Sequence, residues 1–323
     1  MSEELDFHPL PFFKKSFHQT VMGSFPSIYK DPPSHTCFVL LPDKDYIAME
    51  ITTPDKWKKT DPTVFFIHGL CGSHRSSGLV RLTKKLRKKK IRAIRINLRG
   101  CGSGKGKARK LYHGGQSDDI FYAIKKIHSE TPDSKMFLVG FSLGANISLK
   151  LSAEISIANM KMLHKTIAIN PPVDLYSSIK LLGKKENRIY ERYFIKLLRE
   201  DIEYRQKIFR DIAEIKFPDS MSFMEFDNLY TAPVYGFKNN LDYYKRSSSK
   251  YLISAIDFKC NILFSEDDPI IKIHSFDRIV LPKNVKLFRT KKGGHIGYIT
   301  MPTINQSIHW IDNIILQWIF EDL

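Results

Sequence analysis

The residues best suited to chemistry lie in the stretch "VGFSLGAN", where Ser142 stands at the centre of a G-x-S-x-G pattern. Strand-like residues precede the serine ("KMFLVGFS"), and a helical pattern follows it ("LGANISLKLSAEI"). A strand-to-helix turn of this kind is so sharp that the positions of Gly140 and Gly144 must be small, and it exposes the serine hydroxyl above the sheet. In this context the pattern predicts that Ser142 is a nucleophile.

A nucleophilic serine needs a base to take its proton and an acidic group to orient that base. His295 lies in a glycine-flanked loop, "KKGGHIGY", after a predicted strand, and Asp267 and Asp268 follow the strand before it, in "SEDDP". Because all these residues follow strands, they would lie on the serine's side of a parallel sheet. We predict that His295 is the base and that Asp268, which directly precedes Pro269, is the acid. Asp267 is the alternative.

Backbone donors are also required, because negative charge would develop on the carbonyl oxygen under attack, and each lost donor costs about 3–4 kcal/mol. One donor is expected to be the N–H of Leu143, next to the nucleophile. The second is expected to be the N–H of Leu70 in "HGLCGS", after the first long apolar strand. We interpret His68 in that segment as a structural residue that holds the loop. No metal or organic cofactor is implied.

A second glycine-rich stretch, "RGCGSGKGKARK" at 99–110, raises the question of a phosphate site, since glycine turns after strands often bind phosphate. A phosphate-binding Walker loop needs two glycines separated by four residues, then lysine and a hydroxyl residue. Here Arg99 stands five positions before Gly104, and Gly106 follows Lys105. The dinucleotide-binding spacing fails too, because the glycines alternate and no helix follows. Nucleotide binding is therefore not predicted.

The elements that would position these residues alternate between strand and helix from about 63 to 170, which is typical of a mostly parallel sheet with helices on both faces. A hairpin is predicted over 36–51. From 173 to 250 the pattern becomes helical and highly charged, which we interpret as an insertion, or cap, over the sheet. Strands then resume at "KCNILFS" and "NVKLFRT", so 1–323 is predicted to be a single α/β domain.

The composition is that of a globular protein, with 42% hydrophobic and 26% charged residues in a chain of 323. The sequence has no run of about 18 apolar residues that could span a membrane. Its N-terminal "MSEELDFHPLPFFKK" lacks the basic-then-apolar order of an export signal. Four cysteines lie far apart without a CxxC pair, which favours a reduced protein over a disulfide framework or a zinc site. We expect a cytoplasmic protein.

Part of the formal net charge of +17 is concentrated at 81–95, where nine of fifteen residues are Lys or Arg and none is acidic. Leu79, Leu82 and Leu86 form an apolar stripe at helical spacing, so the favoured interpretation is a solvated helix face. Peripheral contact with an anionic membrane is the alternative. Nucleic acid is the least favoured partner, because no nucleic-acid-binding module accompanies the run.

The motifs together resemble those of the YheT-like α/β-hydrolases, over nearly the whole chain. The resemblance rests on "FIHGLCGS", "GFSLGAN", the Pro-Pro pair after the next strand, "FDNLYTAPVYGFKNNLDYY", "SEDDP" and "GGHIGY". It implies the α/β-hydrolase fold, with relatives that are esterases and lipases of membrane-linked lipids. It also implies that the "RGCGSG" loop turns tightly near the mouth of the site, without a phosphate. Two departures do not touch the triad: Lys259 replaces a proline, and Phe17 stands where a histidine often precedes Gln19-Thr20.

These features predict a serine hydrolase that cleaves carboxylic esters of small molecules or lipids through an acyl-enzyme on Ser142. A lipid acyltransferase or thioesterase with the same triad is the first alternative, and transfer to an added alcohol or thiol would distinguish it. The second alternative is a non-catalytic module that binds membranes or nucleic acid, for which a broken triad would be expected. The sequence does not specify acyl chain length, head group or oligomeric state.

Overall fold

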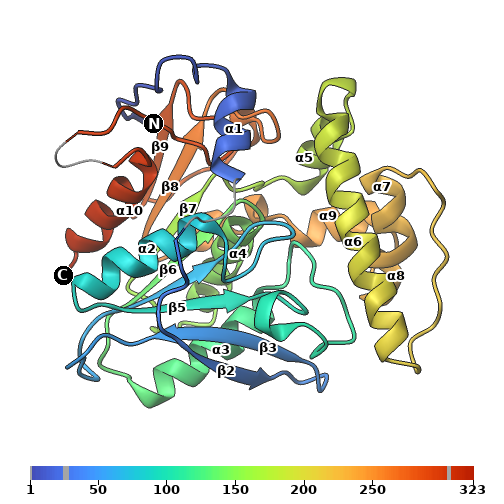
Figure 1. The fold of residues 1–323 in the computed structure, drawn as a ribbon, viewed down its shortest axis with the longest axis horizontal. Helices are drawn as coiled ribbons and strands as arrows, with labels where there is room; N and C mark the ends of the chain where they lie inside the picture. Colours follow the sequence, from blue (N-terminus) through green and yellow to red (C-terminus); the bar gives the residue numbers. More distant parts are fainter. Residues whose placement is uncertain (1, 25–28, 304–306) are drawn as a thin grey trace.

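The computed structural model describes residues 2–24, 29–303 and 307–323, and within these residues nine strands form one sheet (Figure 1). The strand order is β1-β9-β8-β7-β6-β4-β5-β3-β2. Strand β3 pairs antiparallel with β2 and β5, and the other neighbours are parallel. The strands are β1 (Glu3–Glu4), β2 (His35–Leu40), β3 (Tyr46–Thr52), β4 (Thr63–Ile67), β5 (Arg92–Asn97), β6 (Met136–Phe141), β7 (Lys165–Ile169), β8 (Lys259–Ser265) and β9 (Val285–Thr290).

The central strands are buried on both faces, as their nearly continuous apolar sequences require. Helices α2 (Ser77–Lys88) and α10 (Trp310–Phe320) cover one face, with α1 (Ser16–Ser24) against α2. Helices α3 (Ser117–Glu130) and α4 (Leu143–Ile157) cover the other. The predicted α/β architecture is confirmed, including the hairpin, which is formed by β2 and β3.

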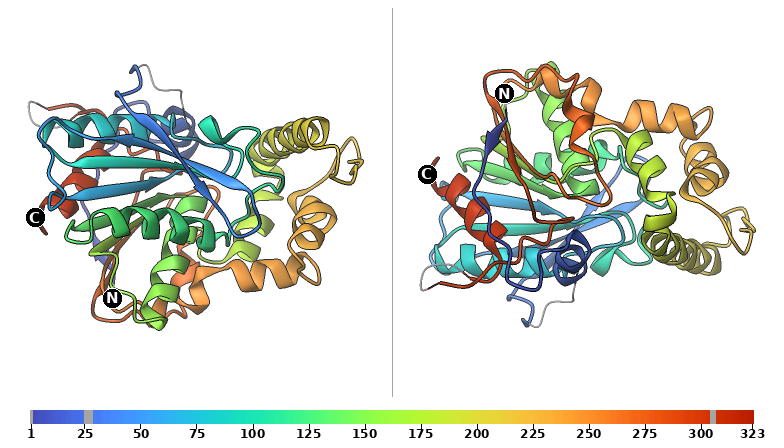
Figure 2. Two further views of the ribbon diagram at one scale, coloured as in Figure 1. Left: turned by 90° about the horizontal axis from the view of Figure 1, so that it is seen from below. Right: turned by 90° about the horizontal axis from the view of Figure 1, so that it is seen from above.

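Residues 173–250, the segment that we interpret as a cap, lie beyond the carboxyl ends of the strands (Figures 1 and 2). Its α-helices are α5 (Leu175–Leu182), α6 (Arg188–Ile208), α7 (Phe223–Phe226), α8 (Ala232–Val234) and α9 (Asn240–Ser247). A π-helical turn, Asp227–Thr231, joins α7 to α8. Short 3-10 turns occupy Gly102–Gly104, Lys185–Asn187, Ser249–Tyr251, Ile253–Ala255 and Ile273–Phe276. The cap therefore faces the edge of the sheet formed by the carboxyl ends of the strands, where the candidate catalytic residues lie.

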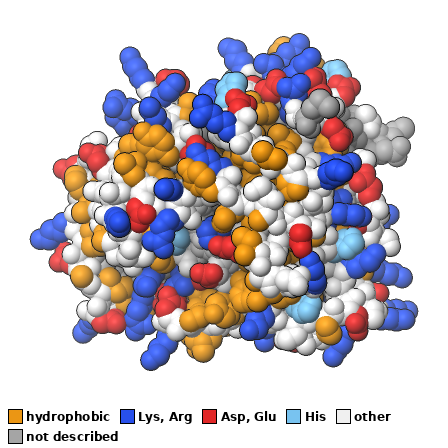
Figure 3. All heavy atoms as spheres, turned by 180° about the vertical axis from the view of Figure 1, so that it is seen from behind, with side chains coloured by type: hydrophobic (Ala, Val, Ile, Leu, Met, Phe, Trp, Pro, Cys, Tyr) orange, Lys and Arg blue, Asp and Glu red, His pale blue; other side chains and the backbone are white. Residues whose placement is uncertain are grey.

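The basic run at 81–95 is not one solvated face, although the leucine stripe of α2 is buried as predicted. Arg92 and Arg95 belong to β5 and are buried. The guanidinium of Arg92 lies 4.0 Å from the ring centroid of Trp57, and Arg95 donates to the carbonyl of His74 at 3.0 Å. The exposed cations of the run are Lys88, Lys89 and Lys90 at the end of α2. On the rear face of the molecule, Lys and Arg side chains are spread over the surface, and many lie along its outline (Figure 3).

Within the described residues, no helix combines the length and the apolar character needed to cross a bilayer.

Candidate active site

Ser142 occupies a tight turn between β6 and α4, with φ 50° and ψ −120°. A Cβ at Gly140 would lie 2.4 Å from the carbonyl oxygen of Gly144, and a Cβ at Gly144 would lie 2.5 Å from the carbonyl oxygen of His68. Both positions must therefore be glycine for the strand, the turn and the neighbouring loop to approach one another. The backbone N–H of Ser142 donates to the carbonyl of Ile169 at 2.9 Å, which fixes the turn to β7.

His295 connects the serine to an aspartate. Its Nε2 lies 2.8 Å from Oγ of Ser142, and its Nδ1 lies 2.8 Å from Oδ2 of Asp268. The His295 side chain is 12% exposed and that of Asp268 is 0% exposed. Because an ionised carboxylate can only accept, Nδ1 of His295 must carry the proton, and Nε2 is then the acceptor for the Ser142 hydroxyl.

Asp268 is held as an acceptor by three further donors. The backbone N–H groups of Ile270 and Ile271 donate to its Oδ1 at 2.8 and 2.9 Å, and Nδ2 of Asn170 donates to its Oδ2 at 2.8 Å. The amide of Asn170 is oriented in turn by the buried hydroxyl of Tyr298, which donates to its Oδ1 at 2.9 Å. Sequence analysis missed Asn170 and Tyr298, because no local motif marks either residue.

Asp267, the alternative acid, does not contact the imidazole. Its Oδ1 accepts from the backbone N–H of Gly294 at 2.9 Å and from the hydroxyl of Ser265. Asp267 therefore ties the end of β8 to the glycine loop that carries His295. The two neighbouring aspartates have different positions in the site: Asp268 contacts the imidazole ring, and Asp267 contacts the loop.

Helix α1 holds the His295 loop from the other side. The backbone N–H of His295 donates to Oγ1 of Thr20 at 2.9 Å. Gln19 makes two contacts with Ile299, accepting from its N–H at 2.7 Å and donating to its carbonyl at 3.0 Å. Sequence analysis assigned no role to these residues, and the only available signal was the Gln-Thr pair noted in the family resemblance.

The expected backbone donors flank the serine. Within the described part of the chain, the N–H groups of Leu70 and Leu143 have no hydrogen-bond acceptor, and both residues border the cavity above Ser142. The next N–H along the loop, that of Cys71, donates to the hydroxyl of Tyr112 at 2.7 Å. That bond fixes the loop while leaving the N–H of Leu70 available to a ligand.

His68 is a structural residue of this loop. Its Nδ1 lies 2.7 Å from the carbonyl oxygen of Gly69, and the N–H of Leu98 donates to its Nε2 at 3.1 Å. Burial lowers the pKa of His68 to about 4, so the ring is neutral at physiological pH. Both ring nitrogens have partners, which leaves neither for proton transfer with a substrate.

A cavity of about 780 Å³ extends from Ser142 and His295 beneath the cap. Its cap side is apolar, with Leu175, Ile179, Leu182, Phe194, Phe223 and Ile270 among the lining residues. Its other side is bordered by the C-terminal half of α1 and the N-terminal end of α2 and is more polar. No group of three or more His, Cys, Asp or Glu side chains within residues 2–24, 29–303 and 307–323 is arranged to hold a metal ion.

The glycine loop at 99–110 is one of the contacts between the core and the cap. Arg205 of α6 donates to the carbonyls of Arg99, Ala108 and Lys110 at 2.9, 2.5 and 2.8 Å. A Cβ at Gly100, where φ is +76°, would lie 1.8 Å from Nη2 of Arg205. The loop thus presents carbonyl acceptors to an arginine of the cap, which is the opposite polarity to a phosphate cradle.

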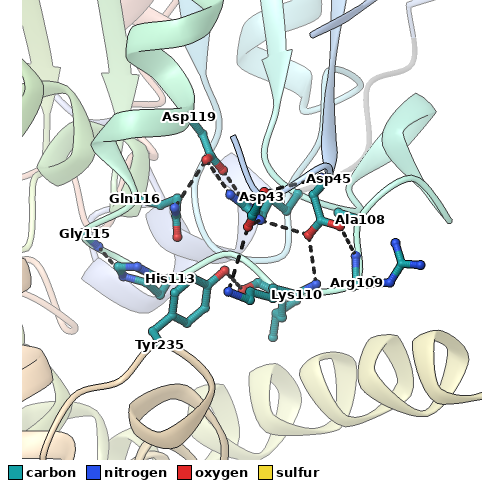
Figure 4. A network of polar contacts seen from close by, with 12 residues as sticks. Asp43, Asp45, Ala108, Arg109, Lys110, His113, Gly115, Gln116, Asp119 and Tyr235 are labelled. Atoms are coloured by element: carbon teal, nitrogen blue, oxygen red, sulfur yellow. Dashed lines mark hydrogen bonds and ion pairs between the residues drawn. The ribbon is translucent and has the colours of Figure 1, made fainter. Parts of the chain in front are cut away.

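The side chain of Arg99 contacts three aspartates that lie close together in Figure 4, of which Asp45 and Asp119 are buried and Asp43 is 33% exposed. It donates to Asp119 through Nε and Nη2 at 2.7 and 2.8 Å, and through Nη1 to Asp43 and Asp45 at 2.6 and 2.9 Å. Burial alone would lower the pKa of Arg99, but the hydrogen bonds and charge of its partners outweigh burial and raise it. Asp45 also accepts from the backbone N–H of Arg109 at 2.8 Å, so the cluster fixes the loop on which Arg205 rests.

The chain is similar in sequence and fold to several known proteins. A family model described as "alpha/beta hydrolase fold" matches residues 62–172. The chain is 24% identical to the YheT protein of Escherichia coli (strain K12), over 98% of this chain and 94% of that protein. It is 29% identical to the monoacylglycerol lipase of Saccharomyces cerevisiae, over 73% of this chain but only 55% of that protein.

Among solved structures, 2,6-dihydroxy-pseudo-oxynicotine hydrolase superposes with a TM-score of 0.60 at 15% identity, over 90% of this chain and 68% of that one. At this level of identity the likeness concerns the fold alone. The fold, the family model and the length of the YheT match agree with one another. The chain therefore has the α/β-hydrolase fold and is similar to YheT over nearly its whole length.

Proposed function

We propose that the protein is a serine hydrolase that cleaves carboxylic esters, with Ser142 as nucleophile, His295 as base and then acid, and Asp268 as the residue that orients His295. The observation that carries this proposal is the pair of 2.8 Å contacts from the two ring nitrogens of His295, one to Ser142 and one to Asp268. An apolar cavity that begins at the same serine supports an ester substrate over a charged one.

In the first half of the reaction, Oγ of Ser142 attacks the carbonyl carbon while its proton passes to Nε2 of His295. Asp268 stabilises the resulting imidazolium through the hydrogen bond that it already accepts from Nδ1. The carbonyl oxygen becomes an oxyanion, which the N–H groups of Leu70 and Leu143 would bind. When the intermediate collapses, the bond to the alcohol oxygen breaks, and that oxygen takes the proton from Nε2. The acyl group remains on Ser142.

In the second half, water attacks the acyl-enzyme and gives a proton to Nε2 of His295. The same two backbone donors stabilise the second oxyanion. Collapse releases the carboxylic acid, and the proton on Nε2 returns to Oγ of Ser142, which restores the starting state.

We propose that the acyl chain of the substrate occupies the cap side of the cavity, which is lined by aliphatic and aromatic side chains. A volume of about 780 Å³ lies within the range of about 300–1,000 Å³ that is usual for small-ligand sites. This favours an ester with a single acyl chain over a larger lipid with several chains. The similarity to a protein named monoacylglycerol lipase supports the same substrate class.

Labelling with a fluorophosphonate probe, followed by hydrolysis of p-nitrophenyl esters of increasing chain length, tests the proposal. The parent protein should be labelled and should hydrolyse the esters, whereas Ser142→Ala should do neither. Ser129→Ala is the matched control, because Ser129 is an exposed serine on α3 outside the cavity. A folded parent protein that neither labels nor turns over any ester would refute the proposal. Products that depend on added alcohol would instead indicate acyl transfer.

A further inference from the structure

Large apolar side chains are exposed beside the mouth of the cavity. Phe12 is 91% exposed and Phe17, on α1, is 49% exposed, while Ile189 and Tyr193, one turn apart on α6, are 63% and 59% exposed. We call these four residues the apolar rim. Isolated exposed apolar residues are ordinary, but a group of them around one opening marks an interaction surface.

Ring contacts bring the two halves of the apolar rim together. The ring centroids of Phe17 and Tyr190 are 6.2 Å apart, which joins α1 to the first turns of α6. Helix α1 and the N-terminal end of α6 both lie in the upper part of Figure 1. Phe12 is held beside α1, because its carbonyl oxygen lies 3.2 Å from Nδ1 of His18. Tyr193 lines the cavity and is also exposed, so the cavity reaches the surface within the apolar rim.

Exposed cations are close in sequence to the residues of the apolar rim. Six exposed basic residues flank it in the chain, and none of them has an ion-pair partner among the residues that the structure describes: Lys14, Lys15, Lys184, Lys185, Arg188 and Arg192. Glu186 is the exposed acid within the same stretch of α6 and the turn before it. Long basic side chains of this kind can bury their stems in an apolar layer while their charges stay at its surface.

We infer that the protein docks on an anionic phospholipid surface through the apolar rim and its flanking cations, with the mouth of the cavity facing the lipid. Aromatic and aliphatic side chains would enter the boundary between head groups and acyl chains, and the cations would contact the negative head groups. This inference rests on the proposed function, because an ester lipid could then pass from the layer to Ser142 without crossing water.

The basic run at the end of α2 offers a matched comparison. Helix α2 starts at the carboxyl edge of the sheet, where Ser77 lines the cavity, and runs back for twelve residues, or about 18 Å. Lys88, Lys89 and Lys90 are therefore exposed at the opposite end of the molecule, beside the C-terminus in Figure 1. Charge reversal of these three lysines changes the net charge as much as reversal of three lysines beside the apolar rim.

The test is sedimentation with vesicles of phosphatidylcholine, with and without phosphatidylserine. Lys14→Glu/Lys15→Glu/Lys185→Glu should lower partitioning onto anionic vesicles on the order of 100-fold, since each cation at such a surface contributes about fivefold. Lys88→Glu/Lys89→Glu/Lys90→Glu should lower it less than about tenfold, because charges distant from the surface are screened. Phe12→Ser/Ile189→Ser should weaken binding even at high salt, where the electrostatic part is suppressed.

Equal losses from the two lysine triples would overturn the inference, as would parent protein that does not prefer anionic vesicles. Self-association that the Phe12→Ser/Ile189→Ser pair abolishes, without any vesicle binding, would assign the surface to a second copy of the chain and also overturn it. Hydrolysis of a soluble short-chain ester should be unchanged in all three variants, which shows that they fold. Parent protein that binds vesicles but cleaves no ester would refute the proposed function and leave the docking surface standing.

Discussion

Changing Asp268 to asparagine keeps the size of the side chain but removes its charge and replaces one acceptor oxygen by an NH₂ donor. The remaining oxygen is expected to stay with the N–H groups of Ile270 and Ile271, which donate to it at 2.8 and 2.9 Å. The new NH₂ group then faces two donors, Nδ2 of Asn170 and Nδ1–H of His295, each 2.8 Å from the oxygen that it replaces.

The histidine can relieve this conflict by moving its proton to Nε2, but Ser142 then has no acceptor for its hydroxyl proton. Loss of the correct tautomer should lower kcat by about 10⁴, or about 5–6 kcal/mol of transition-state stabilisation. The facing donors of Asn170 and the new amide should also cost about 1–3 kcal/mol of folding free energy. The variant is therefore expected to fold with a lower Tm and to be almost inactive.

Asp267→Asn is the control, one residue away in the same turn. Its amide oxygen can still accept from Gly294 and Ser265, and the other carboxylate oxygen of Asp267 is buried without a partner among the described residues. We expect kcat/KM for a p-nitrophenyl ester to stay within about tenfold of the parent value, since no hydrogen bond to His295 changes. If Asp267→Asn is the more damaging substitution, or if Asp268→Asn keeps a tenth of the activity, the assignment of the acid is wrong.

Three further outcomes are expected. Ser142→Ala should lose probe labelling and lower kcat on the order of 10⁶-fold, and residual labelling would point to another nucleophile. Thr20→Val removes the acceptor of the His295 N–H, so kcat should fall about tenfold or more with KM little changed, as a steady-state series at fixed pH would show. Burial raises the pKa of Asp227 to about 6, although Thr231 and Tyr244 donate to it. Because this pKa is raised, the stability that Asp227 contributes is present at low pH and is lost as the pH rises through about 6. Above that pH, Asp227→Asn should therefore raise Tm, and the gain in the free energy of unfolding should be no more than about 3 kcal/mol. An unchanged Tm at all pH values would contradict this.

The α/β sheet and its order of elements could be predicted because the central strands are almost wholly apolar and the intervening helices carry a clear stripe. The prediction that Ser142, Asp268 and His295 lie together followed from the same logic, since each comes within five residues of the end of a strand. Polar contacts between segments that are distant in the sequence bring these residues together. The N–H of His295 finds its acceptor 275 residues earlier in the chain, and no pattern within either segment shows this.

Charge was harder to interpret than apolar periodicity. A count of cations at 81–95 cannot distinguish Arg95, which is fully buried and bonded to a carbonyl, from Lys89, which is exposed. The glycine loop at 99–110 gave a similar difficulty, because Gly100 allows the approach of Arg205 from the cap. A side chain from another element decides the role of each residue, and sequence spacing alone does not identify that side chain.

The dependence of His295 on α1 has a consequence for the order in which the protein is made. A growing chain contains α1, the nucleophile turn and most of the sheet well before its histidine loop exists, so α1 must wait for that loop. Strands β1 and β9, which lie on either side of these segments in the sequence, also pair in the sheet. A nascent or truncated chain that lacks α1 or the histidine loop would present Ser142 on a largely assembled core and yet hold no aligned base. The base would therefore be aligned only after the histidine loop has been made and has packed against α1.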